Sequence, residues 1–297
     1  MSTVRALFAG PGAVRALGSD RRGVVELVFH RCAYARLESD WLLVAEPSLP
    51  FGPLSVAVAG FDRLDLGPGL PVLVTRGRLR LGDQVLSLER MRKRSGPSAS
   101  GFGTASAIRE ACTAVALPDP PGVPLPHPPE VLRAGLAALA TGRMRVAVRS
   151  LAGVGEGLTP AGDDVLAGYA AARAALGAPV TLSTQAAGRS SPLGLAYLCC
   201  AERGELPDVA ARVLGAICRG SSSEVAATVP ALSAWGATSG IALAWGLVAG
   251  VSVAGSGPPA AASVGPGGPV RSGPAARTRA TGRHPARVSR HSPRRPR

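Results

Sequence analysis

The sequence predicts an α+β protein in which a β-rich N-terminal part precedes a mainly helical part and a disordered tail. Three observations lead to this prediction. Short β-like runs broken by Gly, Pro and Asp fill residues 24–88, and apolar segments of helical length fill residues 160–250. Beyond residue 255 the composition collapses to Gly, Pro, Ala, Ser and Arg, which bury too little apolar surface to offset chain entropy. The expected parts are 1–103, 104–254 and 255–297.

Six short runs in the first third of the chain are typical of strands. Gly77 and Gly82-Asp83 stand where tight turns are expected, because Gly tolerates a positive φ and Asp hydrogen-bonds its own backbone. A small antiparallel sheet or barrel is therefore predicted, followed by a basic linker. The expected strands are Val24–Phe29, Trp41–Ala45, Leu54–Ala59, Val72–Thr75, Arg78–Leu81 and Val85–Leu88.

Most of the remaining chain has helical patterns. The Pro-rich connector 118–129 is an exception, since Pro fixes φ and lacks an amide donor. Residues Met144–Ser150 alternate between apolar and polar, which predicts a strand leading into a glycine loop. The expected helices are Ala105–Ala116, Glu130–Ala140, Pro160–Leu176, Pro192–Arg203, Pro207–Arg219, Ser223–Leu232 and Ser239–Gly250.

The distribution of charge along the chain argues against nucleic-acid binding by residues 1–254. The net charge is +14, but nine arginines lie in residues 255–297, which have no acidic residue, so the rest of the chain carries only +5. Nucleic acid is therefore not an expected partner, except for nonspecific binding through the tail.

Disulfide-rich proteins and zinc proteins are disfavoured by the pattern of Cys and His. The five cysteines form no C-x-x-C pair, and no histidine has a partner at zinc-ligand spacing, so neither a disulfide framework nor a zinc site is expected.

Localisation signals are also missing from the pattern. The start of the chain has no signal-peptide pattern. Residues 241–254 are apolar but shorter than the roughly 20 residues that span a bilayer. A cytoplasmic protein without membrane contact is expected.

A glycine-rich loop before a helix start is the strongest candidate for a binding site. Thr159 is a favourable N-cap and Pro160 suits the first helical position. Gly153, Gly155 and Gly157 let the backbone turn tightly and approach a ligand, whose negative charge the free amides and the helix dipole would favour. The pattern lacks the P-loop lysine and the glycine spacing of a dinucleotide fingerprint. It therefore predicts an anion site of another kind.

Two adjacent carboxylates, Asp163 and Asp164, begin this helix. Beside an anion they would repel it unless a cation bridges them or one carboxyl acts on a proton. Adjacent helical residues point about 100° apart, so only one of the two is expected to face the site. Simple complementarity to the helix dipole is the alternative, although it does not explain the preceding glycines.

Two other segments offer groups that bind anions. Arg189 could hold a carboxylate or phosphate in a bidentate manner, and Ser190 or Ser191 could cap the following helix. The alternative is a capped helix with a surface arginine. Thr238 and Ser239 place two hydroxyls at another helix start, where a plain N-cap is the alternative.

These segments resemble a bacterial family of formerly unknown function that includes AllH, a subunit of oxamate carbamoyltransferase. Residues 157–164, Gly-Leu-Thr-Pro-Ala-Gly-Asp-Asp, are close to the family hallmark. The helix that follows Arg189, with the 201–205 block Ala-Glu-Arg-Gly-Glu, is similar to the second family block, and residues 238–240 are similar to the third. The β-rich part resembles the family only in layout.

The resemblance implies carbamoyl transfer between oxamate and phosphate, in concert with companion transferase subunits, as in purine and allantoin catabolism. Oxamate or another small carboxylate, carbamoyl phosphate and phosphate are the expected ligands. Asp163 and Asp164 are the predicted catalytic residues and would bind Mg²⁺ or another divalent cation. The predicted substrate-binding residues are Gly155, Gly157, Thr159, Arg189, Ser190, Ser191, Thr238 and Ser239.

The sequence leaves open whether this chain is itself an enzyme. One hypothesis is a component of a carbamoyltransferase or of a related enzyme for small carboxylates. The alternative is a metabolite-binding or scaffold subunit that uses the same pocket without turnover.

Overall fold

The computed structural model describes residues 3–75, 77–95, 101–115 and 129–254. The predicted tail and most of the Pro-rich connector lie outside these residues. Within them, strands end at Lys93 and the long helices begin at Ala105, as the α+β prediction requires. The division at residues 103 and 254 stays a prediction.

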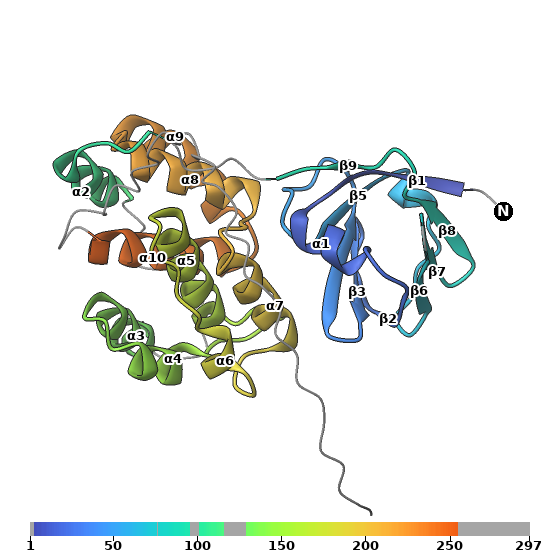
Figure 1. Ribbon diagram of the computed structural model, residues 1–297, viewed down its shortest axis with the longest axis horizontal. Coiled ribbons are helices and arrows are strands. Elements are labelled where there is room, and N and C mark those ends of the chain that lie inside the picture. Colours follow the sequence, from blue (N-terminus) through green and yellow to red (C-terminus); the bar gives the residue numbers. More distant parts are fainter. Residues whose placement is uncertain (1–2, 76, 96–100, 116–128, 255–297) are drawn as a thin grey trace, which may run out of the picture. The chain divides into compact units, whose positions relative to one another are not determined.

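The N-terminal part is a barrel-like sheet (Figure 1). Its strand order is β5-β4-β3-β2-β6-β7-β8-β1-β9, and an additional pairing of β5 with β1 links the two ends of the order. Inward-facing side chains such as those of Leu37, Leu79 and Leu86 are fully buried in its core. The strands are β1 Thr3–Ala9, β2 Arg21–Val28, β3 Cys32–Leu37, β4 Asp40–Ala45, β5 Ser55–Ala59, β6 Pro71–Thr75, β7 Arg78–Leu81, β8 Gln84–Ser87 and β9 Arg92–Lys93.

The six predicted strands are present, but sequence reasoning missed β1, β3, β9 and two short helices. The helices are α1, Pro11–Ala16, and a 3₁₀ helix, Phe61–Arg63, and β9 lies where a basic linker was expected. β1 and β3 contain several alanines and an arginine, which weaken the strand signal. The sheet is also mixed, because β1 runs parallel to β8 and β9, and β4 runs parallel to β5. Such pairings depend on how the chain closes, which local alternation does not specify.

The second part is helical and has its own apolar core. Every helix expected within the described residues is present, with bounds shifted by a few residues, and α6 is additional. The helices are α2 Ala105–Ala114, α3 Pro129–Ala140, α4 Met144–Leu151, α5 Ala161–Ala175, α6 Ser183–Ala186, α7 Pro192–Ala201, α8 Asp208–Arg219, α9 Ser222–Ser233 and α10 Ser239–Ala254.

The strand predicted over residues 144–150 is wrong, because this segment is helix α4. Ala147, Val148 and Leu151 are buried, and Met144 is partly buried against the same core. Those positions follow the i, i+3, i+4, i+7 spacing of a helix face. Val146, which a strand would bury with Met144 and Val148, is 38% exposed. The helical period fits this burial better than the alternation that suggested a strand.

Helices α5 and α10 form the most extensive contact between described helices (Figure 1). A Cβ added at Gly168 of α5 would lie 2.1 Å from the Leu243 carbonyl oxygen, and one added at Gly246 of α10 would lie 2.1 Å from the Val165 carbonyl oxygen. The two backbones therefore touch where each helix has glycine. Among the described residues no helix is both long and apolar enough to cross a membrane. The apolar residues of α10 instead fill the protein core.

Polar contacts join residues of the N-terminal part to the helical part. Asp208 at the start of α8 is buried and forms an ion pair with Arg94, and its amide donates to the Phe51 carbonyl oxygen at 2.8 Å. Arg15 of α1 donates to both carboxylate oxygens of Glu205. Glu205 belongs to the second family-like block, so this end of the block has a structural role.

Candidate functional site

The glycine loop between α4 and α5 depends on three positive φ angles. They are 75° at Gly153, 117° at Gly155 and 95° at Gly157. A Cβ at Gly153 would lie 2.1 Å from the Arg189 carbonyl oxygen, and one at Gly155 would lie 2.6 Å from the Ala161 amide nitrogen. The loop therefore lies against both the Arg189 segment and the start of α5, and only glycine fits at these two positions.

Backbone amides in the loop are available to a ligand. The first ones are used internally, since Gly153 donates to Asp163 Oδ1 at 2.8 Å and Val154 donates to the Leu151 carbonyl oxygen at 2.9 Å. Within the part of the chain that the structure describes, the amides of residues 155–159 donate to no protein acceptor. Consecutive free amides next to a helix N-terminus favour a bound anion.

Thr159 does not cap α5, which corrects the sequence expectation. The N-cap is Pro160, whose carbonyl oxygen accepts from the amides of Asp163 at 2.8 Å and Asp164 at 3.2 Å. The Thr159 hydroxyl instead lies 3.0 Å from the Ser239 hydroxyl at the start of α10. The Thr159 hydroxyl thus contacts a residue 80 positions along the chain instead of capping its own helix.

Asp163 is a buried hydrogen-bond acceptor that holds three segments together. It is 1% exposed. Its Oδ1 accepts from the Gly153 amide at 2.8 Å and from the Ser190 hydroxyl at 2.7 Å, and its Oδ2 accepts from the Ser191 amide at 3.1 Å. Burial raises the pKa of the Asp163 carboxyl, and these hydrogen bonds oppose that shift. Asp163 thus joins the glycine loop and the start of α7 to α5.

Asp164 is also buried, at 4% exposure, but its environment differs. The hydroxyls of Ser239 and Thr159 face its carboxyl group. No described group hydrogen-bonds to its buried Oδ2. Burial raises the pKa of Asp164 well above its usual value, the Ser239 hydroxyl opposes the shift, and the charge of Asp163 adds to it. Asp164 therefore favours the neutral acid and has one oxygen without a partner.

Three helix N-termini meet around the two aspartates. Helix α5 begins at Ala161, and α10 begins at Ser239. Helix α7 is capped by Ser191, whose hydroxyl accepts from the Gly194 amide at 2.9 Å and donates to the Leu158 carbonyl oxygen at 2.7 Å. Each N-terminus carries a partial positive charge, so their convergence favours negative charge at this place. No local sequence pattern shows that the three predicted motifs converge.

The predicted ligand-binding side chains are not all equally close to this centre. Ser190 and Ser191 contact Asp163, and Ser239 contacts Thr159. The Arg189 side chain is exposed and pairs with no other described residue, while its carbonyl oxygen lies against the loop at Gly153. Thr238 contributes its carbonyl oxygen to the Ala242 amide at 3.0 Å, and its side chain makes no hydrogen bond to a described residue.

Glu202 is a supporting residue whose role was missed from the sequence. Its Oε1 accepts from the amides of Leu182 and Ser183, each at 2.6 Å, and its Oε2 accepts from the Ser183 hydroxyl at 2.9 Å. It thereby anchors the start of α6, the helix that leads into the Arg189 segment. The acceptor and its donors are about 20 residues apart, so no local spacing indicates the contact.

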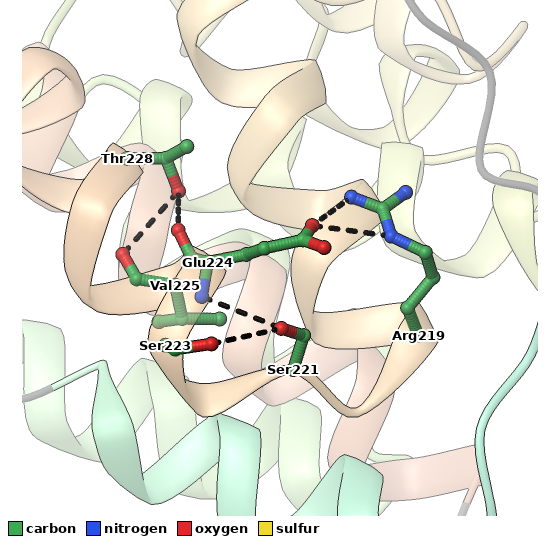
Figure 2. Close-up of polar contacts among 6 residues, drawn as sticks. All are labelled: Arg219, Ser221, Ser223, Glu224, Val225 and Thr228. Atoms are coloured by element: carbon green, nitrogen blue, oxygen red, sulfur yellow. Dashed lines mark hydrogen bonds and ion pairs between the residues drawn. The ribbon is translucent and has the colours of Figure 1, made fainter.

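A separate cavity of about 200 Å³ lies between α8 and α9, away from these motifs. Figure 2 shows its polar side, where Arg219 faces Glu224 and the Ser221 hydroxyl caps the Glu224 amide at 3.4 Å. None of the predicted ligand-binding residues lines it. Because its main charged groups pair with each other, the cavity is a weaker candidate than the aspartate centre.

The donor atoms around the aspartates fit a divalent cation poorly. Mg²⁺ requires near-octahedral oxygen coordination. Both oxygens of Asp163 already accept hydrogen bonds, and the described residues contain no group of three or more His, Cys, Asp or Glu side chains that could hold a metal ion. A cation held by the protein side chains alone does not suit this geometry. The metal role of Asp163 and Asp164 stays a prediction.

Replacing Asp164 with asparagine should remove a pH dependence of stability. A raised pKa means that the folded protein keeps a proton that the unfolded chain releases above a pKa of about 3.9. The proton linkage of Asp164 thus has no effect on stability below about pH 4. Above that pH, the free energy of unfolding falls by up to about 1.4 kcal/mol per pH unit until the folded-state pKa is passed. Urea unfolding of Asp164→Asn between about pH 5 and pH 9 should show a flatter curve.

The control for this experiment is Asp83→Asn, since Asp83 is exposed in the turn between β7 and β8. It should keep the wild-type pH profile. Equal pH slopes in wild type and Asp164→Asn would contradict the assignment of a neutral buried acid.

Comparison with known protein families connects this centre to one of them. Neither the curated proteins nor the solved structures gave a match. The family model described as oxamate carbamoyltransferase subunit AllH matches residues 151–251, and the barrel lies outside the match. The matched segment contains the glycine loop, both aspartates and the N-termini of α7 and α10. The predicted resemblance is therefore confirmed for residues 151–251, which are similar to the AllH subunit of oxamate carbamoyltransferase over the segment that forms this site.

Proposed function

We propose that the chain is a subunit of a carbamoyltransferase-type enzyme and binds a small anionic substrate at the N-termini of α5, α7 and α10. The observation that supports this most directly is the convergence of three helix N-termini beside a loop whose amides at residues 155–159 have no acceptor in the described structure. The family match covers the same residues. Companion subunits, a cytoplasmic location and a place in allantoin breakdown belong to this proposal.

The loop and the helix starts are suited to positioning and charge stabilisation. Phosphate or the phosphate end of carbamoyl phosphate would accept hydrogen bonds from the amides of residues 155–159. Arg189 would hold the carboxylate of oxamate, because its exposed guanidinium pairs with no described residue. Carbamoyl transfer then moves the carbamoyl carbon between the oxamate nitrogen and a phosphate oxygen. Fixing the two reactants and stabilising negative charge would supply most of the rate gain.

The roles of the two aspartates in this proposal differ. Asp163 positions the loop and the start of α7 through its three hydrogen bonds. Asp164 is the carboxyl that would contact the amide group of the substrate, through its unpaired Oδ2. If Mg²⁺ takes part, the substrate oxygens would have to supply most of its ligands.

A thermal-shift titration of the full chain tests the anion site. Phosphate, carbamoyl phosphate and oxamate are added singly, with and without Mg²⁺. A ligand that binds only the folded protein raises the melting temperature with concentration. Arg189→Ala should leave the ligand-free melting temperature unchanged and weaken oxamate binding by roughly 10-fold or more, as expected for a lost charge-assisted hydrogen bond.

The matched control is Arg212→Ala, because Arg212 is an exposed arginine of α8 that lines the separate cavity. It should bind oxamate as the wild type does. Equal weakening in both variants would show that only overall charge matters. The absence of a shift with every ligand would overturn the proposed site.

A further inference from the structure

The Asp164 carboxyl has an oxygen to which a bound carboxylate anion could not donate a hydrogen bond. Its Oδ2 is buried and has no described hydrogen-bond partner. A buried polar atom left without a partner costs roughly 1–3 kcal/mol, so native structures rarely retain one without a reason. The atom lies at the start of a 15-residue helix, next to the loop with free amides. This oxygen is therefore an atom at the centre that a bound ligand could pair with.

A primary amide matches this carboxyl group better than a carboxylate does. The unpartnered Oδ2 can accept a hydrogen bond, and a primary amide has an N–H that donates one. A carboxylate offers only acceptors, and the nearby charge of Asp163 would repel it. Even an ionised Asp164 would accept from an amide N–H but not from a carboxylate.

We propose that Asp164 binds the amide end of the substrate, while Arg189 holds its carboxylate and the amides of residues 155–159 bind phosphate. This inference rests on the proposed function, since both ends belong to one small ligand. It assigns an orientation to a molecule such as oxamate, which has an amide and a carboxylate on adjacent carbons. It also predicts that the site distinguishes oxamate from oxalate, in which a second carboxylate replaces the amide.

Few side-chain contacts hold the part of the glycine loop that precedes Asp164. Leu158 at its tip is 37% exposed. Two side-chain contacts hold this part of the loop: Ser191 Oγ donates to the Leu158 carbonyl oxygen at 2.7 Å, and the Thr159 and Ser239 hydroxyls lie 3.0 Å apart. A ligand can exchange its own hydrogen bonds for these two.

The test measures dissociation constants for oxamate and oxalate by calorimetry on the full chain. Wild type should prefer oxamate by roughly 10-fold or more, because oxalate has no N–H to donate to Oδ2 and carries a second negative charge beside Asp163. Asp164→Asn should retain the preference, since its amide also presents a donor and an acceptor. Asp164→Leu, similar in size but without polar atoms, should reduce it to about twofold or less. A purely structural role would not change this ratio.

A second measurement needs no variant. N,N-Dimethyloxamate keeps the amide carbonyl and the carboxylate but has no N–H, and the wild type should bind it at least roughly 10-fold more weakly than oxamate. Equal affinity for oxamate and oxalate, or an unchanged ratio in Asp164→Leu, would overturn the inference and leave the anion site standing. Failure of every ligand to bind would overturn the proposed function together with the inference.

Discussion

Gly162→Ala should prevent the helical part from reaching its native structure. A Cβ at this position would lie 1.8 Å from the Leu151 carbonyl oxygen, 2.7 Å from its carbonyl carbon and 3.1 Å from its Cα. All three atoms belong to the backbone, so no side-chain rotation can relieve the clash. The end of α4 and the start of α5 would have to separate, at a cost above about 3 kcal/mol. Circular dichroism with urea unfolding measures the loss.

Gly67→Ala is the matched control for this substitution. An added Cβ there meets nothing within 4 Å, and the residue is not in the positive-φ region. Its stability should stay within about 0.5 kcal/mol of wild type. If Gly162→Ala were as stable as this control, α4 and α5 could not be in contact at Leu151.

Asp163→Ala should cost about 3–5 kcal/mol of unfolding free energy. The substitution removes the acceptor of the Gly153 amide, the Ser190 hydroxyl and the Ser191 amide at once. Each donor left unsatisfied in a buried place costs roughly 1–3 kcal/mol, and relaxation of the loop recovers part of the sum. Urea unfolding at neutral pH measures the difference.

Asp163→Asn tests the loss of hydrogen-bond acceptors without a change in side-chain size. Asparagine keeps one acceptor oxygen but places an NH₂ group against at least one of the three donors, so about half of the loss is expected. Asp83→Ala, which removes an exposed carboxylate from a turn, should change stability by less than about 0.5 kcal/mol. A change of less than about 1 kcal/mol in Asp163→Ala would show that the residue does not hold the loop and α7 together.

The sequence predicts elements well where a local period or a turn residue determines them. Six strands were found from short apolar runs between turn residues, and the α5 and α10 regions were found from apolar segments of helical length. The glycine loop was also predictable, since glycine at 153, 155 and 157 matches three positive φ angles in the structure. The family resemblance came from short motifs and is confirmed where those motifs lie.

Local reasoning failed where a distant partner determines the outcome. Alternation in α4 suggested a strand, but contacts with the helical core fix its inward face at Ala147, Val148 and Leu151. Thr159 was expected to cap its own helix, and it contacts Ser239 instead. Glu202 carries no sequence signal for its role, because its donors are at Leu182 and Ser183.

The sequence by itself determined that a glycine loop and two adjacent aspartates open a helix, because those residue types set backbone angles and charge locally. It also predicted that only one aspartate would face the site, since neighbours on a helix diverge by about 100°. Only the tertiary structure decided which partners each aspartate contacts. Asp163 meets the start of α7 and has every oxygen occupied, whereas Asp164 meets the start of α10 and keeps Oδ2 unpaired. That difference arises from three helix N-termini meeting, and their meeting depends on the packing of the whole helical part.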